Sequence, residues 1–510
     1  MRKLCYLFSL LCFLLGWNPA ATAAKPEAWQ LGINQTQIDL SGNPVVVGQI
    51  AATFAQPGTV IVTFDGTCIS SPGDRIVLAA SDQPDWSPND GNTSVEAFDD
   101  DRNRNPFSHT RAYSVGAGSY DFYAVAQNYV ETDGNGIASI YGSLSVKFFP
   151  DQVLAGEARP EAFFQGISQT NIDLEGSAVV VGEISFEAPQ SGRVVVRFDG
   201  KCIASLGDRI VLAASDHAGW TPNDGNVGIE ASSDDVNRKS FAHSRSYLVG
   251  PGNHTFYAVA QNYVETDGSG IASIYGGLTV EYYPDLAGIY AFSAQEAISE
   301  TNIEVLGAPV TVASTQLNLP EAGTVLLRFD GEIISSPGDR IVAAAADTPD
   351  WSPNDGNVSM EAFSSDVNQN SFSHTRAYAA GPGLHTFYAV VESYVETDGS
   401  GMASVYGSFT VEFFPETTTA TNELTDLSPS LKVFPNPTEG ICTVRIGTPL
   451  TEPVKVEVIN TDGRIMQSLG WKDPLEMSDL RIDLTNYPAG AYFLRLSGKS
   501  TTGAQVLVKR

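Results

Sequence analysis

The sequence predicts an all-β protein, built as three tandem antiparallel β-sandwich repeats of jelly-roll type and a small β-sandwich domain at the C-terminus. Three observations support this fold class. The chain of 510 residues contains three copies of one segment. Each copy consists of short alternating apolar and polar stretches separated by turn residues. No stretch shows the 3.6-residue apolar periodicity of a helix.

The repeat is defined by its most similar segments. The copies "FDGTCISSPGDRIVLAASD", "FDGKCIASLGDRIVLAASD" and "FDGEIISSPGDRIVAAAAD" begin at Phe64, Phe198 and Phe329. In each copy an aromatic pair and a proline end the repeat, and this proline follows the first Phe by 86 residues. Equal spacing without an insertion indicates that the copies share their loops as well as their core.

The strands can be placed within the first copy. "GTVIVTF" alternates and runs into Asp65-Gly66, which predicts a two-residue hairpin turn there. "SPGD" at Ser71–Asp74 predicts a β-turn with Pro and Gly at its centre. "FSHTRAYSV" places Phe107, His109, Arg111, Tyr113 and Val115 on one face of a strand. About eight short strands in about 125 residues predict a two-sheet sandwich with its own core in each copy.

Domain boundaries follow from the repeat and from composition. The prediction is a signal peptide at 1–24, repeats at 25–151, 160–286 and 289–416, a polar linker at 417–430 and a final domain at 431–510. The first segment has a basic start, an apolar stretch from Leu4 to Trp17 and small residues at Ala21–Ala23. This pattern is typical of a secretory signal peptide, and no other apolar run approaches the length of a transmembrane segment.

The charge of the chain limits its partners. There are 29 basic and 59 acidic residues, and the formal net charge is −30. This balance argues against nucleic acids and anionic membranes as partners, because both need patches of Lys and Arg. It leaves many carboxylates that can attract cations.

The C-terminal domain carries three ordered motifs. They are Phe434-Pro435-Asn436-Pro437 with Gly440, then Asn460 and Asp462-Gly463-Arg464, and finally Tyr487-Pro488-Ala489-Gly490 before Lys509. In these motifs the segment 431–510 resembles the C-terminal sorting domain of type IX secretion substrates. The resemblance implies an Ig-like β-sandwich that is recognised by the type IX secretion machinery. It also implies passage through the periplasm of a Gram-negative bacterium, and release or anchoring at the outer surface.

The three repeats resemble, in size and strand order, the jelly-roll modules of the complement C1q and tumour-necrosis-factor type. This likeness concerns the fold alone. Single modules of that type associate as trimers between chains, so three linked copies could close into a pseudo-trimer. An extended array is the alternative.

One retained polar loop is a candidate metal site. "PNDGN" occurs without change in all three copies, next to a tryptophan. Asn and Asp oxygens are ligands that Ca²⁺ accepts, and glycine lets a loop fold around an ion. The candidate calcium ligands are Asn89, Asp90, Asn92, Asn223, Asp224, Asn226, Asn354, Asp355 and Asn357. The alternative is a structural turn, because all these residues are turn formers.

Aromatic and acidic residues near the loops form a candidate ligand site. "YVETDG" is a second loop that does not change between the copies. Aromatic faces combined with carboxylates are typical of sugar-binding sandwiches. The candidate ligand-binding residues are Trp86, Trp220, Trp351, Asp133, Asp267 and Asp398. The alternatives are a hairpin turn and a tryptophan in the core.

The chain offers little that is typical of an enzyme. One histidine recurs in each repeat, at His109, His243 and His374, and we expect it to be packed and hydrogen-bonded. Ser108 precedes it, but Ala242 stands at that position in the second copy, which excludes a shared serine nucleophile. Cys68 and Cys202 correspond to Ile333, so buried thiols are favoured over a disulfide.

These observations predict an exported, non-enzymatic, adhesin-like binding protein that calcium stabilises. Glycans or surface proteins are its expected partners. The alternatives are a carbohydrate-binding array and a structural spacer of a surface layer. Loops usually vary more than cores, so unchanged polar loops need either a demanding backbone or a ligand.

Overall fold

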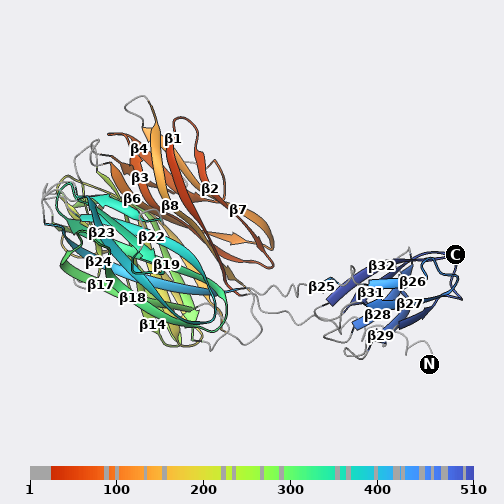
Figure 1. Ribbon diagram of the computed structural model, residues 1–510. Helices are drawn as coiled ribbons and strands as arrows, with labels where there is room; N and C mark the ends of the chain where they lie inside the picture. The colour runs from red at the N-terminus through yellow and green to blue at the C-terminus, as the bar shows by residue number, and fades with distance from the viewer. Residues whose placement is uncertain are drawn as a thin grey trace. The chain divides into compact units, whose positions relative to one another are not determined.

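The computed structural model consists of β-strands and connecting segments (Figure 1). It describes residues 25–85, 91–97, 103–130, 135–151, 158–219, 225–231, 237–264, 269–285, 292–350, 356–362, 369–395, 400–416, 425–426, 431–446, 454–460, 465–471, 480–497 and 501–510. The chain forms two compact units, Met1–Glu416 and Thr417–Arg510. The all-β prediction is confirmed.

The first repeat contains eight strands in two sheets. They are β1 (Glu27–Asp39), β2 (Val45–Phe54), β3 (Gly58–Ser70), β4 (Arg75–Ser81), β5 (Thr93–Glu96), β6 (Arg104–Val115), β7 (Gly118–Val130) and β8 (Ile137–Pro150). One sheet has the order β1-β8-β3-β6 and the other β2-β7-β4-β5, with antiparallel pairing throughout. Apart from β4 and β5, which pair within one sheet, successive strands alternate between the sheets, as in a jelly roll.

The other two repeats reproduce this arrangement. The second contains β9 (Glu161–Asp173), β10 (Val179–Ala188), β11 (Gly192–Ala204), β12 (Arg209–Ser215), β13 (Val227–Glu230), β14 (Arg238–Val249), β15 (Gly252–Val264) and β16 (Ile271–Pro284). The third contains β17 (Phe292–Glu304), β18 (Val310–Leu319), β19 (Gly323–Ser335), β20 (Arg340–Ala346), β21 (Val358–Glu361), β22 (Gln369–Ala380), β23 (Gly383–Val395) and β24 (Met402–Pro415). Their sheet orders match those of the first repeat.

Each repeat has its own hydrophobic core between its two sheets, as expected. In the first repeat Phe64 and Phe107 are fully buried and meet edge to face, with ring centroids 4.7 Å apart. Cys68 lies in this core as a free buried thiol, and Cys202 does the same in the second core. Ile333 takes the corresponding place in the third core. The prediction of buried thiols is confirmed.

The predicted hairpin at Asp65-Gly66 is wrong. Both residues lie inside β3, where Gly66 pairs with Phe107 on one side and Gly142 on the other. Glycine is needed here because β3 and β8 approach closely, and an added Cβ would lie 2.1 Å from the carbonyl oxygen of Tyr141. The predicted turn at Ser71–Asp74 is correct, since the Asp74 amide bonds the Ser71 carbonyl at 3.2 Å.

The three repeats close around a common axis. Six apolar residues, two from each repeat, form one cluster on that axis: Ile61, Phe149, Val195, Tyr283, Leu326 and Phe414. The strands β6, β14 and β22 contact one another, so each repeat contacts both others. The repeats therefore form a pseudo-trimer rather than an extended array.

The C-terminal unit is a small two-sheet β domain. A five-stranded sheet has the order β25-β32-β31-β28-β29, and a three-stranded sheet has the order β26-β27-β30. The strands are β25 (Thr425–Asp426), β26 (Leu431–Phe434), β27 (Ile441–Ile446), β28 (Val454–Asn460), β29 (Ile465–Trp471), β30 (Leu480–Asp483), β31 (Gly490–Ser497) and β32 (Thr501–Lys509). Leu431, Val456, Ile482 and Leu494 are among the residues of its core.

Candidate functional site

Most of the predicted site residues lie outside the described part of the chain. This holds for Trp86, Trp220, Trp351, Asp133, Asp267 and Asp398, and for Asn89, Asp90, Asn223, Asp224, Asn354 and Asp355. Among the candidate calcium ligands, the described ones are Asn92, Asn226 and Asn357. Asn92 is buried, and its side-chain oxygen accepts a hydrogen bond of 2.7 Å from the Lys201 ammonium of the second repeat. The end of this loop therefore lies at the boundary with a neighbouring repeat.

Two cavities lie at such boundaries. The larger, of about 870 Å³, lies between the third repeat and the first. The smaller, of about 540 Å³, lies between the first repeat and the second. In the larger cavity the third repeat contributes the end of "PNDGN" and β22, and the first repeat contributes the start of β1. In the smaller cavity the first repeat contributes the end of "PNDGN" and β6, and the second repeat contributes the start of β9.

The two cavities are the same site at two interfaces. All 14 residues that line the smaller cavity have their counterparts, at the same repeat position, in the lining of the larger one. Eleven of these positions carry the same residue type in both cavities. The three that differ pair Phe164 with Gln30, Ser168 with Asn34, and Lys201 with Thr67. The shared lining shows that a cavity here is a property of the repeat interface rather than an accident of one loop.

Basic side chains converge on both cavities. Arg104, Arg340 and Arg376 line the larger one, and Arg111, Lys201 and Arg238 line the smaller one. Among the described lining residues of either cavity there is no Asp or Glu. Burial, with Arg238 and Arg75 nearby, lowers the pKa of Lys201 to about 8. The lining residues thus place several basic groups together in a chain whose net charge is −30.

Buried glutamates behind the cavities orient two arginines at each site. Glu361 bonds Arg340 at 2.7 Å and Arg104 of the first repeat at 3.3 Å. In the same way Glu96 bonds Arg75 at 2.5 Å and Arg238 of the second repeat at 3.4 Å. Two guanidinium groups and one shared carboxylate have a net charge of about +1. Arg376 and Arg111 add another, since neither forms a salt bridge with a carboxylate of the described residues.

The recurring histidine has a structural role at the edge of these cavities. The Nδ1 atom of His109 accepts a hydrogen bond of 3.0 Å from the Ala80 amide, and His243 and His374 accept the equivalent bonds at 2.9 Å. Burial lowers the pKa of each of these histidines to about 3, and the neighbouring arginine adds to the effect. The imidazole is therefore neutral and holds β6 against β4, which confirms the expectation of a packed, hydrogen-bonded histidine.

The third interface, between the second repeat and the third, has the same backbone but different side chains. Glu332 stands where Lys201 and Thr67 stand elsewhere, and Gln369 stands in place of Arg238 and Arg104. The Glu332 carboxylate accepts a hydrogen bond of 2.5 Å from the Gly228 amide. Gln295 bonds the Ser246 amide at 2.5 Å and the Ser244 carbonyl at 3.2 Å. Side chains of the protein itself thus bond across this interface.

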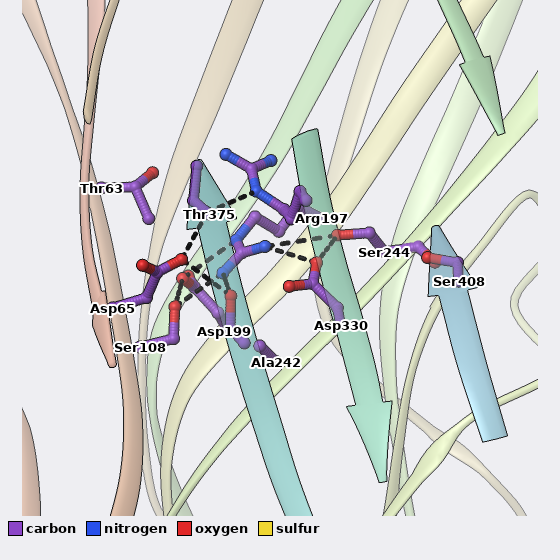
Figure 2. A network of polar contacts seen from close by, with 12 residues as sticks. Thr63, Asp65, Ser108, Arg197, Asp199, Ala242, Ser244, Asp330, Thr375 and Ser408 are labelled. Carbon is purple, nitrogen blue, oxygen red and sulfur yellow. Dashed lines mark hydrogen bonds and ion pairs between the residues drawn. The ribbon is translucent and has the colours of Figure 1, made fainter. Parts of the chain in front are cut away.

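A buried polar network links the repeats close to the axis (Figure 2). Ser108 and Thr110 of the first repeat donate to Asp199 of the second, at 2.8 and 2.6 Å. Ser244 of the second repeat donates to Asp330 of the third, and Ser373 and Thr375 of the third donate to Asp65 of the first. The hydrogen bonds therefore run in one direction around the axis and close the ring.

Arginines complete this network in two of the three repeats. Thr63 corresponds to Arg197 and Arg328. Arg197 bonds Asp330 at 2.5 Å and Asp199 at 3.1 Å (Figure 2). Burial would raise the pKa of Asp330, but Arg197 and Arg328 outweigh it and the pKa is lowered. At Asp65 burial prevails and raises the pKa.

A second charged layer on the axis is equally asymmetric. Lys147, Glu281 and Glu412 are counterparts, and the Lys147 ammonium bonds Glu281 at 2.5 Å and Glu412 at 3.2 Å. The Tyr283 hydroxyl lies 2.9 Å from Glu281 and 2.6 Å from Glu412. Burial raises the pKa of Glu281, whereas at Glu412 Lys147 and Arg328 outweigh burial and lower the pKa to about 2.

The first and last sorting motifs both bond the final strand of the C-terminal domain. The Asn436 amide bonds β32 twice, donating to the Val506 carbonyl at 2.7 Å and accepting from the Val508 amide at 2.9 Å. Lys509 donates to the carbonyl oxygens of Thr485, at 2.9 Å, and Tyr487. The first and last motifs are thus tied to the final strand. Pro435, Pro437, Gly440 and Gly490 lie in the described part of the domain, and Gly463 lies outside it.

A sequence-family model also identifies the C-terminal domain. Residues 432–510 match the model of the secretion system C-terminal sorting domain. These residues are a type IX sorting domain. The sorting domain directs the protein to the cell surface or the extracellular space, and the secretion machinery is its partner. The described part of the chain contains no helix long and apolar enough to cross a membrane.

Other comparisons add only distant structural similarity. No curated protein matches the chain. A β-glucuronidase of Faecalibacterium prausnitzii matches at 10% identity with a TM-score of 0.14, over 45% of this chain and 47% of that one. PNGF-II matches at 11% identity with a TM-score of 0.23, over 50% of this chain and 66% of that one. This chain thus spans about half the length of the glucuronidase that it matches.

The arginines were not among the predicted site residues, although the repeats contained a clue to them. Arg111, Arg245 and Arg376 follow the recurring histidine in "SHTR", "AHSR" and "SHTR". A basic residue that persists in three copies of a strongly acidic chain points to a specific role. The described residues contain no group of three or more His, Cys, Asp or Glu side chains placed to hold a metal ion.

Proposed function

We propose that this protein is an exported, non-enzymatic binding protein whose ligands occupy the two cavities between its repeats. The observation that carries the proposal is the shared lining of these cavities, with 14 corresponding positions at two separate interfaces. Volumes of about 870 and 540 Å³ are of the size that small-molecule or oligosaccharide sites usually have. The sorting domain supports an extracellular setting for this binding.

The lining supports a carbohydrate as the class of ligand. Tyr141 and Tyr275 each contribute a half-buried ring at the corresponding place, and amide, hydroxyl and guanidinium groups surround them. An aromatic face beside convergent hydrogen-bonding groups is the usual composition of a sugar site. Two sites on one rigid unit raise the avidity for a multivalent surface, which is what an adhesin-like protein needs.

The recurring histidine supports a binding role rather than catalysis. Its Nδ1 atom is occupied by a backbone amide and its pKa is lowered to about 3, so it is a poor general base near neutral pH. A structural spacer of a surface layer is the competing function. It would need a closed pseudo-trimer but no cavity with a shared lining.

A glycan array and surface extracts would test the proposal on the secreted chain. Asn34→Trp and Ser168→Trp place a large ring at the exposed edge of each cavity. Ser299→Trp is the matched control, because Ser299 has the same repeat position at the third interface. We expect the double variant to lose binding and the control to retain it. Absence of binding by the unmodified chain to glycans and surface proteins would favour the spacer.

We also propose calcium as a stabilising ion at the "PNDGN" loops, a role that rests mainly on the sequence. In the first repeat Asn92 is bonded to the Lys201 ammonium, which disfavours its side-chain oxygen as a calcium ligand. Asn226 and Asn357 belong to the other two loops. Unfolding of the whole secreted chain in EDTA and in calcium tests this role. Calcium at about 100 times its Kd would add about 2.7 kcal/mol for one site, and an unchanged unfolding temperature would leave the loops as turns.

A further inference from the structure

The two cavities carry positive charge that the protein does not neutralise with its described residues. Arginines bonded to a buried glutamate line both cavities, Arg104 and Arg340 in the larger and Arg238 in the smaller. A further arginine, Arg376 or Arg111, lines each cavity and forms no salt bridge with a described carboxylate. Lys201 is the third basic group that lines the smaller cavity. Holding several cations together at an interface opposes assembly unless an anion joins them.

The chemistry of these cations favours a particular kind of anion. A guanidinium group is planar and presents five N–H donors, which suits the two oxygens of a carboxylate or the oxygens of a sulfate. Glu361 and Glu96 hold the paired arginines from behind. Orientation by a buried partner reduces the ordering that a ligand has to impose, so the sites are preorganised for an oxyanion.

An aromatic ring lies in each cavity beside these cations. Tyr141 lines the larger cavity and Tyr275 the smaller, where Lys201 also lies 5.6 Å from the centre of the Tyr275 ring. A ring of this kind can stack on the apolar face of a sugar while the arginines bind its acidic group. The combination distinguishes an acidic saccharide from a simple inorganic anion.

The third interface supplies an internal comparison. There the cationic positions carry Glu332 and Gln369, and the Glu332 carboxylate itself accepts a backbone hydrogen bond from Gly228. The protein thus places its own carboxylate at the interface where Gln369 replaces Arg104 and Arg238. Arg245 is retained at this interface and lies over Tyr247, as Arg111 lies over Tyr113 and Arg376 over Tyr378.

We propose that the two cavities bind acidic saccharides, whose carboxylate or sulfate groups pair with Arg104, Arg340 and Arg376 at one interface and with Arg111, Lys201 and Arg238 at the other. This inference rests on the proposed binding function and names its ligand class. Each chain binds two such ligands, and the third interface binds none.

Titration calorimetry on the secreted chain tests this assignment with defined probes. The acidic probes are trigalacturonate and a sulfated chondroitin disaccharide, the neutral probe is cellotriose, and the simple anion is inorganic sulfate. We expect the acidic saccharides to bind at two sites per chain. Arg111→Gln and Arg376→Gln should each weaken one site at least about 10-fold, which corresponds to about 1.4 kcal/mol. Arg245→Gln is the matched control and should bind like the unmodified chain.

The outcomes separate the ligand class from the underlying function. Equal binding of cellotriose would overturn the charge requirement and leave the proposed function standing. Equal binding of inorganic sulfate would overturn the saccharide. A loss in Arg245→Gln as large as in Arg111→Gln would overturn the location of the sites. Failure of every probe, together with a glycan array that shows no binding, would overturn the proposed function as well. Thermal unfolding of each variant confirms that it is folded.

Discussion

Corresponding residues of the repeats differ in charge in one layer on the axis of the pseudo-trimer, whereas corresponding arginines are retained at the cavities. On the axis the counterparts Lys147, Glu281 and Glu412 differ in charge. Around the cavities Arg111 and Arg376 are the same residue type. In this layer each residue meets its own counterparts, and three identical buried charges without a cation between them would repel strongly at low dielectric. The identical Asp65, Asp199 and Asp330 are instead each bonded by side chains of a neighbouring repeat. A residue at an interface meets a different surface of the next repeat, so identity is tolerated there.

This difference shows what linking the repeats in one chain permits. In a trimer of identical chains the axial positions would be constrained to uncharged or self-compatible residues. On a single chain one lysine can bond two glutamates, and Arg197 can bond aspartates of two repeats. The axial layers contain three cations, Lys147, Arg197 and Arg328, against five carboxylates, of which Asp65 and Glu281 have raised pKa values.

The largest effect is expected from removing the axial lysine. Lys147→Met leaves Glu281 and Glu412 buried without their cation, and we expect the free energy of unfolding to fall by about 3 to 5 kcal/mol. Denaturant unfolding of the secreted chain measures this. Lys455→Met is the control, because Lys455 is 57% exposed and its bond to Glu457 should contribute about 1 kcal/mol or less. Equal losses in the two variants would mean that the axial ion pairs do not hold the repeats together.

A smaller effect is expected from the histidines that border the cavities. Their pKa is lowered to about 3 in the folded state, against 6.5 for the unfolded chain. Their contribution is therefore complete above pH 6.5 and is lost as the pH falls toward 3. As the pH falls from 6.5 to 5, each histidine should lower the free energy of unfolding by about 2 kcal/mol, since one pKa unit is about 1.4 kcal/mol.

His109→Gln isolates this contribution from other titrating groups. Glu332, whose pKa burial raises to about 7, acts in the opposite direction between pH 4.5 and 7, but it is present in both proteins. We expect the unfolding free energy of the variant to depend less steeply on pH, by about one proton. The measurement is the denaturation midpoint at several pH values, with His217→Gln on an exposed turn as control. An unchanged pH dependence would contradict a neutral buried imidazole.

The smallest effect concerns the asymmetry within the hydrogen-bonded ring. Ser108 donates to Asp199, but the corresponding Ala242 leaves Asp330 without this bond. Ser108→Ala should lower the free energy of unfolding by about 1 to 2 kcal/mol, and Ala242→Ser should raise it by up to about 1 kcal/mol. If chemical denaturation shows a loss of stability in Ser108→Ala and a gain in Ala242→Ser, a serine at either position stabilises the ring. A loss in both variants would show instead that the second interface has been repacked around alanine.

Alternation along single strands was enough to predict the fold class and the face of many residues. On β6 the sequence placed Phe107 and Ser108 on opposite faces. Phe107 lies in the core of the first repeat, whereas Ser108 bonds Asp199 of the second. The sorting domain was also predictable, because its motifs are local and ordered. The predicted hairpin failed at Asp65-Gly66 because the same dipeptide also suits a close approach of two strands. Local chemistry alone does not separate a turn from such an approach.

By itself, the sequence determined the three repeats, the buried thiols and the export address, since each depends on residues near one another or on repetition along the chain. Only the tertiary structure decided that the repeats close into a ring, that Ser108 meets Asp199, and that Arg376 of one repeat meets Arg104 of another across a cavity. A strand's period states which residues share a face. It does not state which repeat will cover that face, because that choice depends on packing between distant segments, such as those of Ser108 and Asp199, which are 91 residues apart.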